Sequence, residues 1–236
     1  MDDTHATVYV VDDNAEVRDA IGTLCRSTGL DVCSFASTEE FLRDEKADEP
    51  CCAVLDVRFP GAAATGLECQ DRLRESGISL PIVFISGCAD VRMSVEAMKR
   101  GAVDFLPKPF RDQELLDAIR IGLQRDRVRR EAEEGLKAIR SRIAGLTPRQ
   151  REMLTMMADG LMVKQMAGRL ELSEVTIKVH RSRIMNKLGV RTPLELVRLV
   201  DRLLAAEEFG PSGVQRSPSD VVAKPSIISP PLVQVD

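Results

Sequence analysis

The first half of the chain holds polar residues whose types suit phosphoryl transfer, and each comes at or near the end of a short apolar run. They comprise three carboxylates, one hydroxyl and one ammonium group, a set that can hold a cation and a phosphoryl group together. Residues 8–11 precede Asp12 and Asp13, residues 53–55 precede Asp56, residues 81–85 precede Ser86, and residues 102–106 precede Lys108.

The apolar runs predict where these side chains lie. Short runs rich in β-branched residues and bounded by polar ones are typical of buried parallel strands. In an open α/β sheet, ligands bind beyond the carboxyl ends of the strands. We therefore expect residues that are far apart in the sequence to meet at one edge of a sheet.

The charges of this cluster indicate its chemistry. Crowded carboxylates cannot all remain ionised without a cation, and Mg²⁺ prefers oxygen ligands. We expect Asp12 and Asp13 to bind this ion as a pair. Asp56 stands alone at its strand end, so it is the predicted nucleophile that becomes an aspartyl phosphate. The Lys108 ammonium and the Ser86 hydroxyl would hold phosphoryl oxygens.

Residues 4–124 resemble the receiver domains of two-component response regulators of the FixJ/NarL type. The matching stretches are residues 10–13, 55–58, 84–87 and 101–110. The resemblance implies a doubly wound parallel (βα)5 fold of the α/β class, with the strand order 2-1-3-4-5. It also implies phosphorylation of Asp56 by a sensor histidine kinase. The implied Mg²⁺ ligands are Asp12 or Asp13, Asp56, and the backbone carbonyl of Arg58.

The same resemblance places Ser86 and Phe105 at two switch positions and implies a cis peptide bond between Lys108 and Pro109. One stretch departs from the family. The spacing from Pro60 to Gly66 is two residues longer than usual. An insertion beside the acidic cluster is expected to change the lifetime of the phosphoryl group or the docking of the kinase.

Composition divides the chain into an acidic part and a basic part. Its 236 residues fit about two domains, and its formal net charge is −4. Residues 1–123 are net acidic and residues 124–206 are net basic, so we expect a polyanionic partner for the second part only. The six cysteines lack a metal-binding spacing. No apolar run is long enough to span a membrane, and we expect a cytoplasmic protein without a membrane partner.

A charged stretch, residues 125–144, follows the receiver-like part, residues 1–124. It carries opposite charges at helical i,i+4 spacing, as at Glu133 and Lys137. We expect a helical linker that continues the last receiver helix. Its apolar positions are too sparse to decide between a plain linker and a dimerising helix.

Residues 145–206 are predicted to form an all-α domain of four helices. Thr147 and Gln150 have the spacing of a capping box around an N-terminal turn. Ser173 suits the N-cap of the third helix, which Gly189 ends. Short helices joined by a turn to a helix with a basic face are typical of a helix-turn-helix. The predicted buried stripe of the third helix is Val175, Val179, Ile184 and Leu188.

The stretch 145–205 resembles the LuxR-type DNA-binding domain through residues 146–152, 164–167 and 173–181. The implied contacts to bases or nearby phosphates in the major groove are Lys178, Val179 and Ser182, and those to the DNA backbone are Thr176, Arg181 and Arg183. The resemblance also implies a dimer contact through residues 193–206, a homodimer on activation, and RNA polymerase as a partner. Val163 replaces the usual capping Asn, so we expect a frayed start to that helix.

These features predict a transcriptional response regulator that binds double-stranded promoter DNA after phosphorylation of Asp56, and not an enzyme. A phosphorylation-independent DNA-binding regulator is the alternative. An aspartyl-phosphate phosphatase would need an acid two residues after its nucleophile, where this chain has Arg58. Proteins that bind single-stranded RNA stack bases on aromatic rings, but this chain has no Trp and one Tyr. Residues 207–236, rich in Pro and Ser, are predicted to be a disordered tail.

Overall fold

The computed structural model describes residues 6–59, 65–87 and 91–209. The chain divides into two compact units, Met1–Glu131 and Ala132–Asp236. This division falls inside residues 125–144, the stretch with the sequence pattern of a linker. Most of the predicted tail, residues 210–236, lies outside the described residues. The last helix continues to Phe209, beyond its predicted end at residue 206.

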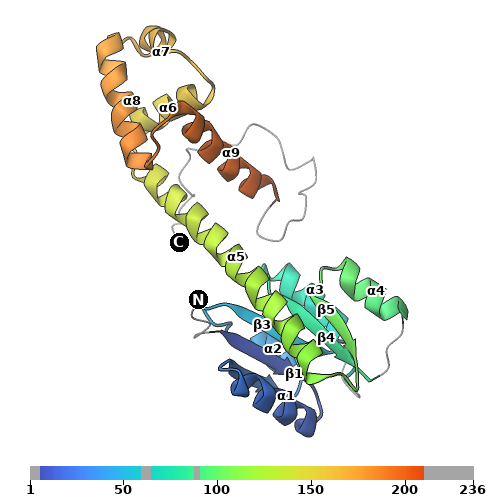
Figure 1. The fold of residues 1–236 in the computed structure, drawn as a ribbon. Helices are drawn as coiled ribbons and strands as arrows, with labels where there is room; N and C mark the ends of the chain where they lie inside the picture. The colour runs from blue at the N-terminus through green and yellow to red at the C-terminus, as the bar shows by residue number, and fades with distance from the viewer. Residues whose placement is uncertain (1–5, 60–64, 88–90, 210–236) are drawn as a thin grey trace, which may run out of the picture. The chain divides into compact units, whose positions relative to one another are not determined.

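The first unit is built on a five-stranded parallel sheet (Figure 1). Its strands are β1 (Thr7–Val11), β2 (Asp31–Phe35), β3 (Cys51–Asp56), β4 (Ile82–Ser86) and β5 (Asp104–Pro107). Their order in the sheet is β2-β1-β3-β4-β5, which confirms the predicted doubly wound fold. β1, β3 and β4 are buried along their whole length, as expected for apolar strands in a sheet with helices on both faces.

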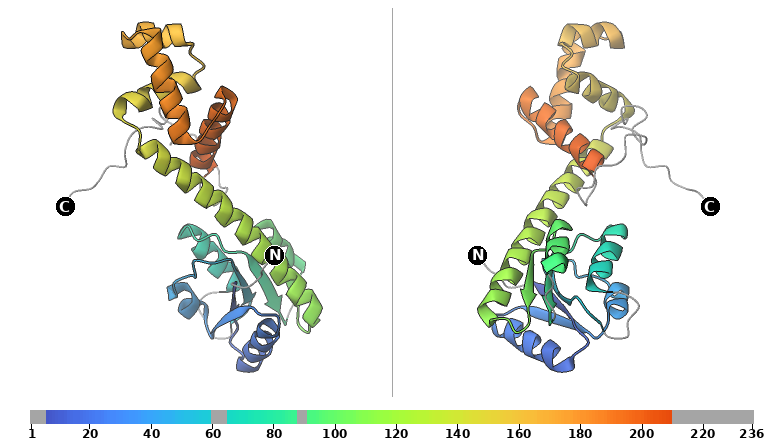
Figure 2. Two further views of the ribbon diagram at one scale, coloured as in Figure 1. Left: turned by 60° about the vertical axis from the view of Figure 1, so that its left-hand side comes forward. Right: turned by 90° about the vertical axis from the view of Figure 1, so that its right-hand side faces the viewer.

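Helices cover both faces of this sheet (Figure 2). They are α1 (Ala15–Ser27), α2 (Thr38–Arg43), α3 (Gly66–Glu75), α4 (Val91–Lys99) and the first part of α5 (Asp112–Ala144). Successive residues of a strand point to opposite faces. Val8 and Val10 of β1 therefore pack in the core beneath α1 and α5, whereas Tyr9 and Val11 pack in the core beneath α2, α3 and α4.

The register of the strands brings their carboxyl ends to the same level. Val11 at the end of β1 pairs with Leu55 of β3, and Asp56 pairs with Ile85 of β4. Residues that end β1, β3 and β4 are therefore close neighbours although they are far apart in the sequence. The structure therefore contains the sheet edge that was predicted to carry the polar cluster.

A buried charge anchors α5 to the amino end of β3, at the opposite end of the strand from Asp56. The fully buried Asp126 carboxylate accepts hydrogen bonds from the Cys51 N–H at 3.0 Å, from Arg129 at 2.6 Å and from Arg130 at 2.7 Å. Burial raises the pKa of Asp126, but hydrogen bonds from Arg130, Arg129 and Cys51 outweigh burial and hold this pKa below its ordinary value. Arg130 also donates to the Ala47 carbonyl at 2.9 Å. The carboxylate thus joins the helix to the start of β3.

Replacing this carboxylate is expected to destabilise the first unit. Asp126→Ala should lower the free energy of unfolding by about 2–3 kcal/mol, because a buried N–H loses its acceptor and two partly buried guanidinium groups each lose a charged acceptor. Since the folded pKa is depressed, the stabilisation is present above the unfolded pKa of about 3.9 and is lost as the pH falls through the folded value.

Denaturant unfolding of the full chain at pH 7 and pH 3 measures both effects. The gap between the wild type and Asp126→Ala should narrow at pH 3. Asp117→Ala is the matched control, because Asp117 is half exposed and its bonds within the described part of the chain are to Gln113 and Arg120 of its own helix. Equal unfolding midpoints for the two variants at pH 7 would contradict the anchoring role.

The second unit contains α6 (Pro148–Ala158), α7 (Val163–Leu170), α8 (Glu174–Leu188) and α9 (Pro193–Phe209). The predicted capping box is present, since Thr147 Oγ1 and Gln150 Oε1 each accept the other residue's N–H at 3.2 Å. α7 begins at Val163, and its N-cap residue, Met162, makes no side-chain hydrogen bond to the first turn. Gln165 Oε1 accepts the Met162 N–H at 2.8 Å. The fraying of this turn stays a prediction.

The last turns of α5 belong to the core of the second unit. Ile139 and Ile143 are buried there among residues of α6, α7, α8 and α9. Arg142 of the same turns donates a hydrogen bond to the Leu188 carbonyl at the end of α8, at 3.1 Å. The packed part of this unit therefore begins before residue 145.

The predicted buried stripe of α8 is wrong at two positions. Val175 and Val179 are 71% and 45% exposed, and Ile177 is buried instead, together with Ile184 and Leu188. A helix of 3.6 residues per turn puts residues 177, 184 and 188 on one face, and it puts residues 175 and 179 about 160° away from residue 177. The two valines therefore lie on the outer face of α8.

Candidate functional site

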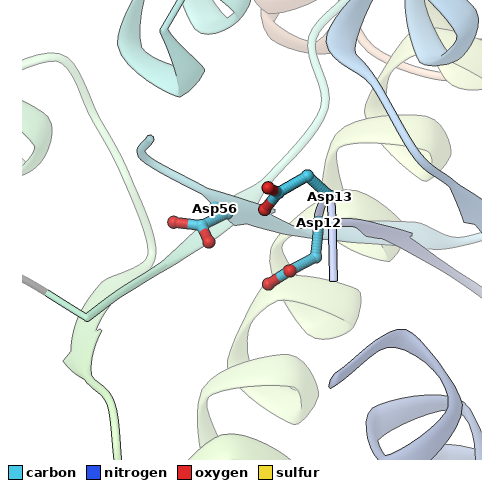
Figure 3. Close-up of side chains that lie close together, drawn as sticks. All are labelled: Asp12, Asp13 and Asp56. Carbon is cyan, nitrogen blue, oxygen red and sulfur yellow. The ribbon is translucent and has the colours of Figure 1, made fainter. Parts of the chain in front are cut away.

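Three carboxylates meet at the carboxyl edge of the sheet (Figure 3). Asp12 follows β1, Asp13 follows it in the chain, and Asp56 ends β3. One oxygen of each lies within 4.8 Å of the others. Asp12 is fully buried and Asp56 is 7% exposed, whereas Asp13 is exposed. Oxygen donors alone, with one side open to solvent, fit Mg²⁺, which keeps several water ligands when bound to proteins.

Lys108 bridges two of the three carboxylates. Its Nζ donates to Asp12 at 2.5 Å and to Asp56 at 2.7 Å. Burial raises the pKa of Asp12, and hydrogen bonds from Lys108 and Asn14 oppose that shift. Burial lowers the pKa of Lys108, but bonds to Asp12 and Asp56 raise it above its ordinary value overall. The ammonium is therefore charged. The Lys108–Pro109 bond is cis.

Two residues that hold the acidic pair were not predicted from the sequence. Asn14 caps α1 by accepting the Glu16 N–H, and its own N–H donates to Asp12 Oδ1, both at 2.9 Å. Arg18 donates to the carbonyls of Asp12 and Asp13 at 2.7 and 3.0 Å. An Asn before a helical pattern is an N-cap signal that could have identified Asn14. Nothing local marks Arg18.

The chain after Asp56 folds closely against the start of α3. The Arg58 N–H donates to Asp56 Oδ1 at 3.2 Å, and the Gly66 N–H donates to the Val57 carbonyl at 3.0 Å. A Cβ at Gly66 would lie 2.2 Å from the Asp56 carbonyl oxygen, so only glycine allows this approach. Residues 60–64, where the predicted insertion falls, lie outside the described residues.

Adding a methyl group at this contact is expected to disturb the site. Gly66→Ala should destabilise the first unit by about 1–3 kcal/mol, because two backbone segments must move apart. Since one of them carries Asp56, phosphoryl uptake should fall as well. Gly22→Ala is the control, because its added methyl would meet only the flexible end of Arg26. Thermal unfolding and phosphoryl labelling measure the two effects, and behaviour like the control in both would contradict the contact.

The two predicted switch residues lie on neighbouring strands. Ser86 ends β4 and is 1% exposed. Phe105 of β5 is half-buried and pairs in register with Phe84 of β4, with 6.4 Å between the ring centroids. A change at the Ser86 hydroxyl can therefore reach the Phe105 ring through one pair of strands.

The predicted DNA-contacting residues lie on or beside the outer face of α8, except Arg181, which lies about 40° around the helix from the buried Ile177. Lys178, Val179, Ser182 and Arg183 are exposed, and Thr176 and Arg181 are half-buried. The first turn of the helix is fixed, because Ser173 Oγ accepts the Thr176 N–H at 3.1 Å. The structure thus presents one helix face that carries cationic, hydroxyl and apolar side chains together.

Comparison with known families agrees with these two sites. The family model described as "Response regulator receiver domain" matches residues 8–120, and the model described as "Bacterial regulatory proteins, luxR family" matches residues 144–200. The chain belongs to the two-component response regulators of the FixJ/NarL type, in which a receiver domain precedes a LuxR-type helix-turn-helix. The predicted family is confirmed, and so is the prediction of a transcription regulator and not an enzyme.

Individual relatives share this architecture. Nodulation protein W of Bradyrhizobium diazoefficiens is 44% identical over 85% of this chain and 87% of its own length. Response regulator protein TmoT of Ectopseudomonas mendocina is 40% identical over 86% of this chain and 91% of its own length. The solved structure of the response regulator StyR is 45% identical, covers 84% of this chain and 98% of its own, and superposes with a TM-score of 0.73.

Family membership also defines the partners in general terms. Receiver domains generally bind Mg²⁺ at their acidic pocket, and a receiver joined to a helix-turn-helix implies a kinase as phosphodonor and DNA as a binding partner. No helix among the described residues has the length and apolar character needed to cross a membrane.

Proposed function

We propose that the protein regulates transcription through DNA binding that is switched by phosphorylation of Asp56, with a sensor histidine kinase as the phosphodonor. The observation that carries this proposal is the Lys108 ammonium held between Asp12 and Asp56, at 2.5 and 2.7 Å, with a third carboxylate, Asp13, close to these two. A structural ion pair needs only one carboxylate. Three clustered carboxylates with one ammonium are suited to a second cation and an incoming anion.

The chemistry of the proposed step follows from the atoms that surround Asp56. A carboxylate oxygen of Asp56 attacks phosphorus, and the bond from phosphorus to the donor breaks. Asp12 or Asp13, Asp56 and the Arg58 carbonyl would hold Mg²⁺, which would supply positive charge beside the transferring phosphoryl group. Lys108 then exchanges one carboxylate contact for a phosphoryl oxygen.

The proposed switch couples the phosphoryl group to the β4 and β5 strands. The Ser86 hydroxyl donates to a phosphoryl oxygen, and the Phe105 ring turns inward beside it. This change biases the face formed by β4, β5 and α5 toward a second state, as a switch requires. We expect that face either to form the homodimer of the active protein or to release the DNA-binding domain.

The proposed output is carried by α8. Lys178, Val179 and Ser182 enter the major groove, and Thr176, Arg181 and Arg183 contact the DNA backbone. The net basic charge of residues 124–206 supports a polyanionic partner. RNA polymerase is the expected partner of the DNA-bound dimer. Within that dimer, α9 is expected to form the contact between the two DNA-binding units.

This coupling is tested by measuring the affinity of the full-length protein for a DNA duplex that the protein itself has selected from a random pool. Phosphorylation by a small acyl phosphate with Mg²⁺ should raise the affinity about 5- to 150-fold, the usual range of coupling between two sites. Ser86→Ala should reduce this gain without preventing phosphorylation. Ser34→Ala, an exposed Ser on β2, is the control. A full gain in Ser86→Ala would remove this residue from the switch.

A further inference from the structure

Two valines on the outer face of α8 have no packing role within the described part of their unit. Val175 is 71% exposed and Val179 is 45% exposed. They lie one turn apart, on the face of α8 opposite the buried Ile177, which packs in the core of the second unit. A valine on a helix surface gains nothing from the core and is a weaker helix former than most alternatives. The packing of the unit therefore does not account for the presence of these two valines.

The neighbours of the two valines indicate what covers them. Lys178 lies beside them on the helix surface, and Ser182 and Arg183 follow on the same face, all three exposed. A second copy of this face would bring like charges together in an apolar contact, which costs free energy. A polyanion with apolar groups in a groove would pair with the cationic side chains and cover the two valines.

The position of Val175 in the helix also matters. In a helix-turn-helix, the first residues of the recognition helix contact base edges in the major groove. Val175 stands in the first turn of α8, which is ordered by the hydrogen bond from the Thr176 N–H to Ser173 Oγ. Its side chain is therefore presented on a fixed turn of the helix.

We propose that Val175 recognises the 5-methyl group of thymine in the major groove. Among the groups that bases expose there, this methyl is the apolar one, and the others are hydrogen-bond donors or acceptors. Val179 is already one of the expected base contacts, whereas Val175 was predicted to be a core residue, so its specificity role is additional to those contacts. The inference rests on the proposed DNA binding and adds the base that the helix face prefers.

The experiment replaces thymines by deoxyuridine, one at a time, in the duplex selected by the full-length protein. Deoxyuridine keeps every hydrogen-bonding group and removes only the methyl. Affinity of the wild type should fall about three- to fivefold at the thymine that Val175 contacts, as expected for one buried methyl. In Val175→Ala the same replacement should have little effect, because the contact is already lost.

Two further variants complete the design. Val175→Ile keeps the apolar contact and should remain sensitive to deoxyuridine. Val128→Ala removes the same atoms from an exposed position of α5, where Val128 is 56% exposed, and should behave like the wild type on every duplex.

The outcomes separate this inference from the proposed function. If the protein binds the selected duplex and no deoxyuridine replacement weakens that binding, the inference is overturned and the proposed DNA binding still holds. Equal sensitivity in the wild type and Val175→Ala would show that Val175 does not contact a methyl. Failure to select any duplex would overturn the proposed function, and the inference would fall with it.

Discussion

Asp56→Asn is expected to abolish uptake of a phosphoryl group from a small acyl phosphate. The amide has the shape of the carboxylate but lacks the negative oxygen that attacks phosphorus. The fold should survive, because Asp56 lies at the end of β3 and its backbone pairing with Ile85 does not depend on the side-chain charge. The wild type should take up about one phosphoryl group per chain, and a chelator of Mg²⁺ should prevent this uptake.

Intact-protein mass measured with Mg²⁺, and again with a chelator, checks this expectation. Asp19→Asn makes the same chemical change at an exposed position of α1 and should be labelled like the wild type. Acid-stable phosphate on a Ser or Thr, without any on Asp56, would contradict the assignment. So would full labelling in the presence of the chelator.

Lys178→Ala and Arg181→Ala are expected to weaken DNA binding in different ways. Loss of a base contact at Lys178 should cost about 1–3 kcal/mol on the selected duplex and much less on unrelated DNA. Loss of a phosphate contact at Arg181 should weaken binding similarly on both and reduce the salt dependence of binding by about one released ion. The two variants thus distinguish recognition of sequence from attraction to the backbone.

Titrations of selected and unrelated duplexes at several salt concentrations measure both quantities. Arg140→Ala is the control for the loss of one positive charge, because Arg140 is an exposed residue of α5 outside α8. An equal loss of specificity in all three variants would mean that general charge, and not the α8 face, determines the preference. In that case the helix-turn-helix assignment would lose its support from these residues.

The strand-end residues were predictable because parallel strands impose their geometry on the chain. The apolar runs before Asp12, Asp56 and Ser86 define strands, and a parallel sheet brings the carboxyl ends of such strands together. The structure accordingly places Lys108 against Asp12 and Asp56. Local capping signals were equally informative, as the box formed by Thr147 and Gln150 illustrates.

The features that sequence reasoning missed depend on tertiary contacts. Nothing near Asp126 indicates that its carboxylate accepts the Cys51 N–H, because the two residues are far apart in the sequence. The close approach of Gly66 to the Asp56 carbonyl likewise follows from how α3 meets β3. The prediction of a buried Val175 is wrong because apolar side chains also occur on exposed helix faces, and Ile177 fits the helical period of the buried residues better.

Control of DNA binding by phosphorylation of Asp56 can be measured in one titration. The selected duplex is titrated with the wild type and with Asp56→Asn, each with and without the acyl phosphate and Mg²⁺. We expect an affinity gain of about 5- to 150-fold for the wild type only, with Asp56→Asn remaining at the unphosphorylated level under both conditions. An unchanged affinity of the fully phosphorylated wild type, or an equal gain in Asp56→Asn, would show that Asp56 does not control DNA binding.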